Sequence, residues 1–287
     1  MTDIRFEFIQ SNSITLHAAV AGPEDGPLAV LLHGFPEFWY AWRFQIPALA
    51  EAGYRVIAPD QRGYNLSDKP EGPEHYRLDQ LRDDIIGLIT HSGHDKALII
   101  GHDWGGAIGW HLAASRPEFV RKLIVANMPH PHALLNVMKN HPLQIVRSSY
   151  IAFFQLPVIP ERIFEMGDYQ SMKQGLKRTS LPGTFSGQDM EAYEAAWAQP
   201  DALTSMLAWY RAIRKGSFRQ VPKSRIKVPV RLIWGLGDHF LSKPLAKESL
   251  KYCEDGYGVF IGEATHWVNR EQPELVNRHL LAFLREN

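Results

Sequence analysis

The sequence predicts an α/β fold in which a mostly parallel central sheet is flanked by helices and carries an inserted helical segment. Two observations lead to this prediction. Short, continuous apolar runs, each ending in Gly, Asp or Asn, alternate with stretches of helical periodicity. A long helical and aromatic stretch interrupts this alternation once, after which it resumes. Continuous apolar runs are typical of strands buried on both faces of a parallel sheet, and their alternation with helices favours right-handed crossovers.

A β-hairpin is predicted at the start of the chain. In "IRFEFIQSNSITLHAAVAG" (residues 4–22), polar and apolar residues alternate on either side of Ser11-Asn12-Ser13. A period of two residues indicates strands, and the small polar triplet between them indicates a turn.

Four buried strands and one amphipathic helix are predicted next. The helix is "LDQLRDDIIGLITHSG" (residues 78–93), in which Leu81, Ile85 and Ile89 recur at helical spacing before Gly93 ends the helix. It falls between the second and the third strand. The four strands are "LAVLLHG", "YRVIAPD", "KALIIG" and "VRKLIVAN", at residues 28–34, 54–60, 96–101 and 120–127.

A helical cap is predicted where the alternation stops. From His130 to Phe218 the sequence is helical and aromatic and contains no buried-strand run. We therefore expect a cap at residues 130–218 over a core domain formed by residues 1–129 and 219–287, although two independent domains would also fit the length. Prolines interrupt the stretch at positions 142, 157, 160, 182 and 200.

The sheet pattern returns after the cap. "VPVRLIWGLGD" (residues 228–238) and "GYGVFIGEATHW" (residues 256–267) each predict a strand followed by a loop. "REQPELVNRHLLAFL" (residues 270–284) predicts one closing helix.

Composition limits the classes of partner. The chain has 31 Lys and Arg residues and 31 Asp and Glu residues, so no net basic field attracts nucleic acid or an anionic membrane, and we expect a small-molecule partner. The only cysteine, Cys253, excludes an intramolecular disulfide framework. The first residues lack the apolar stretch of a signal peptide, and no segment reaches the ~20 apolar residues of a membrane helix. We expect a cytoplasmic protein, either a monomer or a homodimer.

The segment Gly101-His102-Asp103-Trp104-Gly105 is the strongest candidate for a catalytic motif. It follows the predicted strand "KALII" and precedes a helix of small residues. This context is that of a nucleophile elbow, a strained turn that exposes its central side chain at a helix N-terminus. Here Asp103 occupies the position that usually holds serine. The alternative is a helix N-cap aspartate without catalytic function.

Two further candidates follow later predicted strands. Asp238 ends "VRLIWGLGD", and His266 lies in "GEATHW". The order of nucleophile, acid and histidine is the order used by hydrolases with this kind of elbow. Taken singly, Asp238 could cap the next helix and His266 could be a buried structural histidine. Because open parallel sheets place their ligands at the carboxyl ends of strands, we expect the three side chains to meet there.

The motif "HGFPE" (residues 33–37) predicts an oxyanion hole. A strand end followed by Gly and Pro can turn the backbone N–H of Phe35 toward the point at which the N–H of Trp104 is also aimed. A simple Gly-Pro turn is the alternative. The histidines of "HPH" (residues 130–132) could suggest a metal site, but exposed loop or helix-end histidines are the better interpretation, and we expect neither a metal nor a cofactor.

Five segments in order, "HGFPEFWYAWR", "DQRGYNLSDKP", "GHDWGG", "WGLGDHFL" and "THWVNREQP", resemble the epoxide hydrolases of the α/β-hydrolase fold, especially the soluble bacterial group. The resemblance spans nearly the whole chain. It implies a catalytic triad of Asp103, Asp238 and His266. It also implies that two cap tyrosines, Tyr150 in "RSSYIAFFQLP" and Tyr210 in "SMLAWYRA", bind the epoxide oxygen. Composition alone would place both tyrosines in an aromatic core.

The resemblance implies hydrolysis of an epoxide to a vicinal diol with water as the second substrate. A carboxylate that opens the ring forms an ester, which water can cleave, whereas a serine would form an ether that water cannot readily cleave. A haloalkane dehalogenase with the same Asp103 nucleophile is the alternative, and a ligand-binding protein without turnover is another. For the dehalogenase, the indole N–H of Trp104 could bind the departing halide, and Trp197 and Trp209 are the candidates for a second halide donor. We expect an apolar or aromatic substrate in a pocket lined by Phe35, Trp104, Phe153, Phe154, Leu156 and Trp209.

Overall fold

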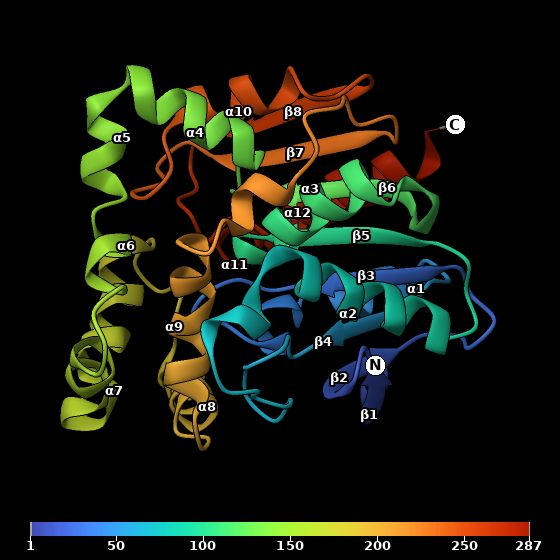
Figure 1. Cartoon of the computed structure of the whole chain (residues 1–287). Helices are drawn as coiled ribbons and strands as arrows, with labels where there is room; N and C mark the ends of the chain where they lie inside the picture. The colour runs from blue at the N-terminus through green and yellow to red at the C-terminus, as the bar shows by residue number, and fades with distance from the viewer. Residues whose placement is uncertain (1, 287) are drawn as a thin grey trace.

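Eight strands form one sheet in the order β1-β2-β4-β3-β5-β6-β7-β8 in the computed structural model, which describes residues 2–286 (Figure 1). The pairs β1–β2 and β2–β4 are antiparallel and the other five pairs are parallel. The predicted fold class is therefore confirmed. The strands are β1 (Arg5–Ser11), β2 (Ile14–Ala21), β3 (Leu28–Leu32), β4 (Arg55–Pro59), β5 (Ala97–His102), β6 (Val120–Ala126), β7 (Val230–Gly235) and β8 (Gly256–Ile261).

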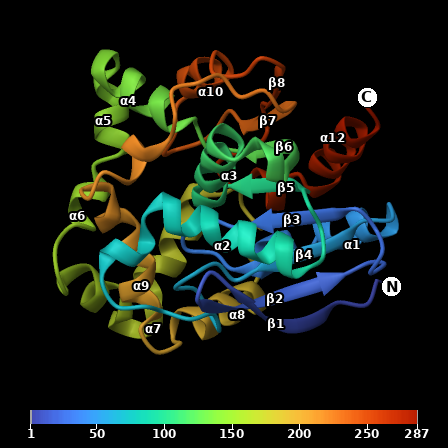
Figure 2. The ribbon, with the colours of Figure 1, turned by 45° about the vertical axis from the view of Figure 1, so that its right-hand side comes forward.

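The predicted hairpin forms the edge of the sheet, where β1 pairs with β2 (Figure 2). Its turn consists of Asn12 and Ser13, with φ values of 44° and 64°. Both residues are in the left-handed region that two-residue hairpin turns require, and asparagine tolerates that region better than most residues. The register pairs Ser11 with Ile14, so the turn predicted from the sequence is confirmed.

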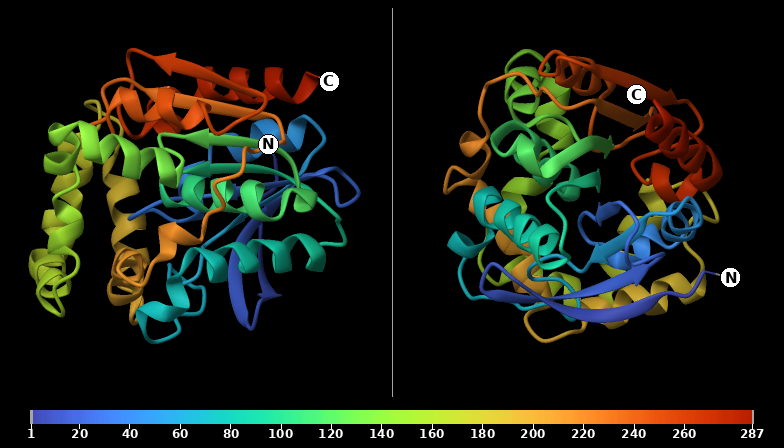
Figure 3. Two further views of the ribbon diagram at one scale, coloured as in Figure 1. Left: turned by 45° about the horizontal axis from the view of Figure 1, so that its top comes forward. Right: turned by 90° about the vertical axis from the view of Figure 1, so that its right-hand side faces the viewer.

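Helices cover both faces of the twisted sheet, as the view along the strands shows (Figure 3, right). Side chains of the buried strands alternate between two hydrophobic clusters: Val30 and Leu32 face one, whereas Ala29 and Leu31 face the other. The first face is covered by α2 (Leu78–His91), α3 (Trp104–Ser115) and α10 (Lys243–Leu250), and the second by α1 (Gln45–Glu51), α11 (Val268–Glu271) and α12 (Pro273–Arg285).

The closing helix predicted at residues 270–284 is instead two helices, α11 and α12. Gln272 lies between them with a φ of −131° and a ψ of 53°, outside the helical region. Pro273 is the first residue of α12. A proline disfavours the helical conformation in the residue before it and is well tolerated at the first helical position, because the N–H it lacks has no partner there. The prediction of one uninterrupted helix was therefore wrong.

An inserted helical cap lies between β6 and β7, beyond the carboxyl ends of the parallel strands (Figure 1). No strand occurs in it within residues 2–286. In α7, the residues from Met166 to Tyr169 leave the helical conformation. The cap helices are α4 (Pro131–Asn140), α5 (Pro142–Arg147), α6 (Tyr150–Phe153), α7 (Ile159–Thr179), α8 (Gly187–Trp197) and α9 (Ala202–Ile213).

The boundaries of the cap remain a prediction, because its first helix packs on the core. The ring of His130 stacks on that of Tyr252 at 4.3 Å, just beyond α10. The side chain of Asn136, on α4, donates a hydrogen bond of 2.9 Å to the hydroxyl of Tyr252. In the part of the chain that the structure describes, no helix is both long enough and apolar enough to cross a membrane.

Candidate active site

Asp103 stands at a sharp turn between β5 and α3. Its φ of 49° and ψ of −124° are unfavourable for any residue with a side chain. The start of α3 comes so close to the end of the neighbouring strand β3 that a Cβ atom on Gly105 would lie 2.1 Å from the carbonyl oxygen of Leu32, which explains why glycine occupies that position. Asp103 makes no capping hydrogen bond with its side chain. The geometry is that of a nucleophile elbow, and it does not support the N-cap interpretation.

The two carboxylate oxygens of Asp103 have different neighbours. Its Oδ1 accepts a hydrogen bond of 2.9 Å from the backbone N–H of Phe35, and its Oδ2 lies 3.5 Å from Nε2 of His266. A Cβ atom on Gly34 would lie 2.3 Å from the Cβ of Asp103, so the turn approaches the carboxylate only because residue 34 is glycine. Trp104 is the first residue of α3, where a backbone N–H has no acceptor within the helix.

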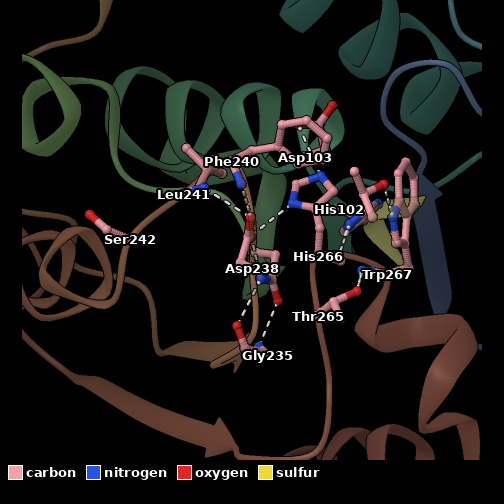
Figure 4. A network of polar contacts seen from close by, with 12 residues as sticks. His102, Asp103, Gly235, Asp238, Phe240, Leu241, Ser242, Thr265, His266 and Trp267 are labelled. Carbon is pink, nitrogen blue, oxygen red and sulfur yellow. Dashed lines mark hydrogen bonds and ion pairs between the residues drawn. The ribbon is translucent and has the colours of Figure 1, made fainter. Parts of the chain in front are cut away.

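Asp238 holds His266 from the other side (Figure 4). Its Oδ2 lies 2.8 Å from Nδ1 of His266 and accepts a second hydrogen bond of 2.6 Å from the side chain of Asn127. Its Oδ1 accepts the backbone N–H groups of Phe240 and Leu241 at 2.7 and 2.9 Å. The structure thus brings together Asp103, His266 and Asp238, which the sequence places at three separate strand ends.

A cavity of about 220 Å³ opens above these residues and is lined mainly by apolar side chains. Asp103 and His266 line it from the core, and Tyr150 and Tyr210 line it from α6 and α9. The two tyrosine rings meet edge to face, with their centroids 5.9 Å apart. Four polar side chains from two layers of the fold therefore converge on one apolar space.

Comparison with known proteins places this arrangement in a family. The family model described as alpha/beta hydrolase fold matches residues 27–273. The chain is 38% identical to human epoxide hydrolase 4, over 97% of this chain and 78% of that protein. The chain belongs to the epoxide hydrolases of the α/β-hydrolase fold. It is also 55% identical to the AB hydrolase superfamily protein YfhM of Bacillus subtilis, over 99% of both chains.

Solved structures of epoxide hydrolases have the same architecture. The crystal structure of Bacillus megaterium epoxide hydrolase with an inhibitor matches with a TM-score of 0.88 and 31% identity, over 98% of this chain and 100% of that one. Epoxide hydrolase A from Mycobacterium thermoresistibile matches with a TM-score of 0.88 and 27% identity, over 99% of this chain and 98% of that one. The resemblance drawn from the sequence motifs is confirmed.

In this epoxide hydrolase, Asp103 and His266 shift each other's pKa. Burial alone would raise the pKa of Asp103, but the hydrogen bond and charge of His266 outweigh burial and hold that pKa below its ordinary value. Burial alone would lower the pKa of His266, whereas Asp238 and Asp103 together raise it from 6.5 to about 10. The site at neutral pH therefore holds a carboxylate beside an imidazolium.

The pKa values of the two cavity tyrosines shift for a different reason. Burial, reinforced by the nearby negative charge of Asp103, raises the pKa of Tyr150 and that of Tyr210 well above the ordinary value of a phenol. Both side chains therefore keep their protons across the physiological pH range and remain hydrogen-bond donors.

Three residues that the sequence reasoning did not single out support the positions of Asp103, Asp238 and His266. His102 lies 2.8 Å through Nε2 from the backbone oxygen of His266 and 3.0 Å through Nδ1 from a carboxylate oxygen of Glu37. The other oxygen of Glu37 accepts the hydroxyl of Tyr193 at 2.8 Å. Asn127 is the third, through its bond to Asp238. Glu37 lies in the motif "HGFPE", and His102 lies next to Asp103 in the elbow motif. Their position inside these motifs is the sequence feature that could have identified them.

Of the six predicted pocket residues, Phe35 and Phe154 line the cavity. Trp104 does not, because its ring lies edge-on against that of Tyr210 at 5.1 Å, which separates it from the space. Phe153 packs on Phe154 at 5.9 Å and so lies outside the cavity lining.

The other two predicted pocket residues point elsewhere. Leu156 is 43% exposed to solvent, and the indole of Trp209 donates a hydrogen bond of 3.0 Å to the backbone oxygen of Arg62, on the core side of α9. Instead, α7 supplies a large part of the wall, which sequence reasoning missed because α7 carries no motif. The cavity residues that were not predicted are Pro36, Phe164, Ser171, Met172, Gly175, Leu176, Thr179, Phe240 and Trp267.

Within residues 2–286, no three His, Cys, Asp or Glu side chains are grouped as a metal site would require. The rings of His130 and His132 stack on each other at 5.6 Å, and Nε2 of His132 lies 2.8 Å from the backbone oxygen of Val221. Both side chains are buried at the start of α4, so the expectation that they are exposed was wrong. They pack between α4 and the segment that follows the cap.

Proposed function

We propose that this enzyme converts an apolar or aromatic epoxide and water into a vicinal diol through an alkyl ester on Asp103. The observation that carries the proposal is the convergence of a carboxylate nucleophile, a histidine and two protonated tyrosines on one apolar cavity. A carboxylate needs no base to become a nucleophile near neutral pH. No cofactor takes part in the proposed reaction.

In the first half-reaction, Oδ2 of Asp103 attacks one carbon of the epoxide from the side opposite the ring oxygen. A carbon–oxygen bond to Asp103 forms while the carbon–oxygen bond of the ring breaks. The hydroxyls of Tyr150 and Tyr210 donate hydrogen bonds to the ring oxygen, and one of them transfers its proton to the developing alkoxide. Oδ1 remains with the N–H of Phe35, which leaves Oδ2 as the attacking oxygen.

In the second half-reaction, water hydrolyses the ester. Nε2 of His266 takes a proton from the water, which attacks the carboxyl carbon of Asp103 while Asp238 orients the imidazolium that forms. The negative charge that develops on Oδ1 is stabilised by the backbone N–H groups of Phe35 and Trp104. The carbon–oxygen bond to the substrate then breaks, the alkoxide takes the proton from His266, and the diol leaves. Asp103 is released as a carboxylic acid and gives its proton to His266, which restores the carboxylate and the imidazolium.

The order of the two steps follows from the pKa coupling. The hydrogen bond and the negative charge of Asp103 are among the causes that raise the pKa of His266. Formation of the ester removes that charge, so the pKa of His266 falls when a base is needed. The imidazolium can then give its proton to the tyrosinate that ring opening leaves, which restores the tyrosine and provides the neutral His266 that the hydrolysis step needs.

The substrate class follows from the cavity wall. Phe35, Phe154 and Phe164 form an aromatic lining beside the proposed reacting groups. A variant of the Bacillus megaterium epoxide hydrolase, matched with a TM-score of 0.89 and 31% identity, was crystallised with a naphthyloxy-propanediol as its product. That enzyme accommodates an aromatic ether on the diol, and we propose a similar apolar or aromatic substituent here.

The dehalogenase alternative loses both candidates for its second halide donor. The indole of Trp197 donates a hydrogen bond of 2.6 Å to the backbone oxygen of Pro36, and that of Trp209 donates to Arg62. Neither N–H is therefore available to a departing halide. A halide also needs no proton, so it gives no role to the two tyrosine hydroxyls at the cavity.

A single-turnover reaction in water enriched in heavy oxygen tests the proposal. With enzyme in excess over styrene oxide, the first diol should carry only ordinary oxygen, and the heavy isotope should enter the peptide that contains Asp103. A parallel reaction with a bromoalkane tests the alternative. Heavy oxygen in the first diol would exclude the ester, and halide release without diol formation would assign the enzyme to dehalogenation.

A further inference from the structure

The neutral net charge hides a strong separation of charges along the chain. Residues 119–160 contain no Asp or Glu, and neither do residues 202–237. The second stretch nevertheless carries the eight cations Arg211, Arg214, Lys215, Arg219, Lys223, Arg225, Lys227 and Arg231. Acidic residues are concentrated elsewhere, so a positive local field coexists with a formal net charge of zero.

The fold brings these two stretches together at one groove. A surface hollow of about 500 Å³ between α4 and the segment after the cap is lined by Lys139, Arg219 and Lys223. All three side chains are exposed, and none forms an ion pair with another residue of the described range 2–286. Leu135, at the same groove, is also exposed. The hollow is therefore cationic with an aliphatic component.

An apolar helix directly follows the groove. Helix α5 begins two residues after α4 ends and stands at the top of the column that α5, α6 and α7 form along one edge of the molecule (Figure 1). Its Leu143, Ile145 and Val146 are 77%, 52% and 69% exposed. Its one buried residue, Gln144, fixes the helix through hydrogen bonds with the backbones of Phe240 and Ser242. The apolar side chains are thus held outward by a rigid attachment.

We infer that this surface, formed by the α4 groove and α5, docks onto an anionic lipid bilayer. The three lysine and arginine side chains face the lipid phosphates, and the aliphatic side chains of α5 enter the boundary between headgroups and acyl chains. A nucleic acid would use the cations but would leave three large aliphatic side chains in water. A small anion would likewise have no use for α5. Of these three partners, the lipid surface is the one that uses both features.

The charges along the same edge set the orientation. Glu165 and Asp168 are exposed at the interruption in α7, the helix at the other end of the column from α5 (Figure 1). An anionic membrane repels them, so α5 contacts the surface while this part of α7 stays in water. None of the docking residues touches the cavity, and the inference is independent of the proposed reaction.

Flotation with vesicles tests the inference. The full-length protein is mixed with vesicles of phosphatidylcholine alone or of phosphatidylcholine with phosphatidylglycerol. We expect binding to the anionic vesicles only, weakened by salt. The triple variant Lys139→Glu, Arg219→Glu, Lys223→Glu should lower the partition coefficient roughly 100-fold or more, since each cation near an anionic surface contributes about fivefold. The matched control Lys96→Glu, Arg121→Glu, Arg278→Glu alters three exposed cations elsewhere and should bind as the wild type does.

The contribution of α5 is tested separately. The triple variant Leu143→Ser, Ile145→Ser, Val146→Ser should lose the part of vesicle binding that survives high salt. Hydrolysis of a water-soluble epoxide by every variant provides the check that each is folded. Wild-type protein that does not bind anionic vesicles overturns the inference. The inference is also overturned if calorimetry shows that the groove binds inorganic phosphate or duplex DNA while flotation shows no binding to vesicles.

Discussion

The two halves of the active site are held in place by different forces. On the core side, Asp103, Asp238 and His266 follow β5, β7 and β8 and are fixed by hydrogen bonds of defined direction. On the cap side, Tyr150 and Tyr210 are held by edge-to-face contacts with aromatic rings, such as Tyr210 against Phe154 at 4.9 Å.

This difference between hydrogen bonding and ring packing predicts how each half of the site responds when a single polar group is removed. A hydrogen bond is lost when its donor or acceptor is removed, and a buried partner is then left unsatisfied. Ring packing is spread over many weak contacts and survives the loss of a hydroxyl. Substitutions on the core side should therefore stop a chemical step, whereas removal of a hydroxyl on the cap side should slow a step and leave the fold unchanged.

The largest expected effect comes from His266→Ala. This variant should still form the ester on Asp103, because the cap half and the nucleophile are intact, but it should lose about 10²–10⁴-fold in turnover. Mass spectrometry of the protein after mixing with styrene oxide should show the covalent adduct.

A matched control for His266→Ala is His239→Ala, which changes an exposed histidine next to Asp238. It should turn over normally and show no adduct. An unmodified mass in His266→Ala despite demonstrated substrate binding would argue against the two-step scheme.

The second effect tests the cap half. Tyr150→Phe and Tyr210→Phe should each slow ring opening, and the double variant should lose about 10²–10⁴-fold in the rate of ester formation, since no acid then protonates the alkoxide. Rapid-quench measurement of the alkylated enzyme gives this rate separately from turnover.

Tyr64→Phe is the control for the tyrosine pair. Tyr64 is fully buried, and its hydroxyl has no hydrogen-bond partner among residues 2–286. Its removal should leave alkylation unchanged. If the double variant at positions 150 and 210 retained the wild-type alkylation rate, the assignment of the two tyrosines would be wrong.

A smaller effect distinguishes the cavity wall from the neighbouring surface. Phe164→Ala removes an aromatic side chain from the lining and should raise KM for an aromatic epoxide by about 10-fold, with little change for a small aliphatic one. Leu156→Ala, at an exposed position outside the lining, should change neither. Equal effects of the two substitutions would mean that the cavity does not bind the aromatic group.

The same contrast explains what could be predicted from the sequence. Asp103, Asp238 and His266 lie next to strands, and strand ends in a parallel sheet meet at one edge, so local patterns place them together. The wall formed by Met172 and Leu176 depends on how α7 docks across the cavity, which no local pattern encodes. For the same reason, aromatic content suggested Trp209 as a pocket residue, although its indole bonds to the core.

The smallest expected effect is a pH dependence of the free energy of unfolding that arises from His266 in the core half and not from the two cap tyrosines. Folding raises the pKa of His266 from 6.5 to about 10, because the native state holds the imidazolium between two carboxylates. The native state therefore binds this proton more tightly than the unfolded state. The resulting stabilisation is fully present below pH 6.5 and is lost as the pH rises toward about 10.

The stability difference between the wild type and His266→Gln should accordingly shrink across that interval, by on the order of a few degrees in Tm. Taking the difference between the two proteins removes the titration of other groups that they share. The double tyrosine variant should keep a constant difference from the wild type below pH 10, because burial holds both tyrosine pKa values well above the ordinary value of 10.0. A pH-dependent difference in the tyrosine variant, together with a constant one in His266→Gln, would reverse the assignment of charge to the two halves of the site.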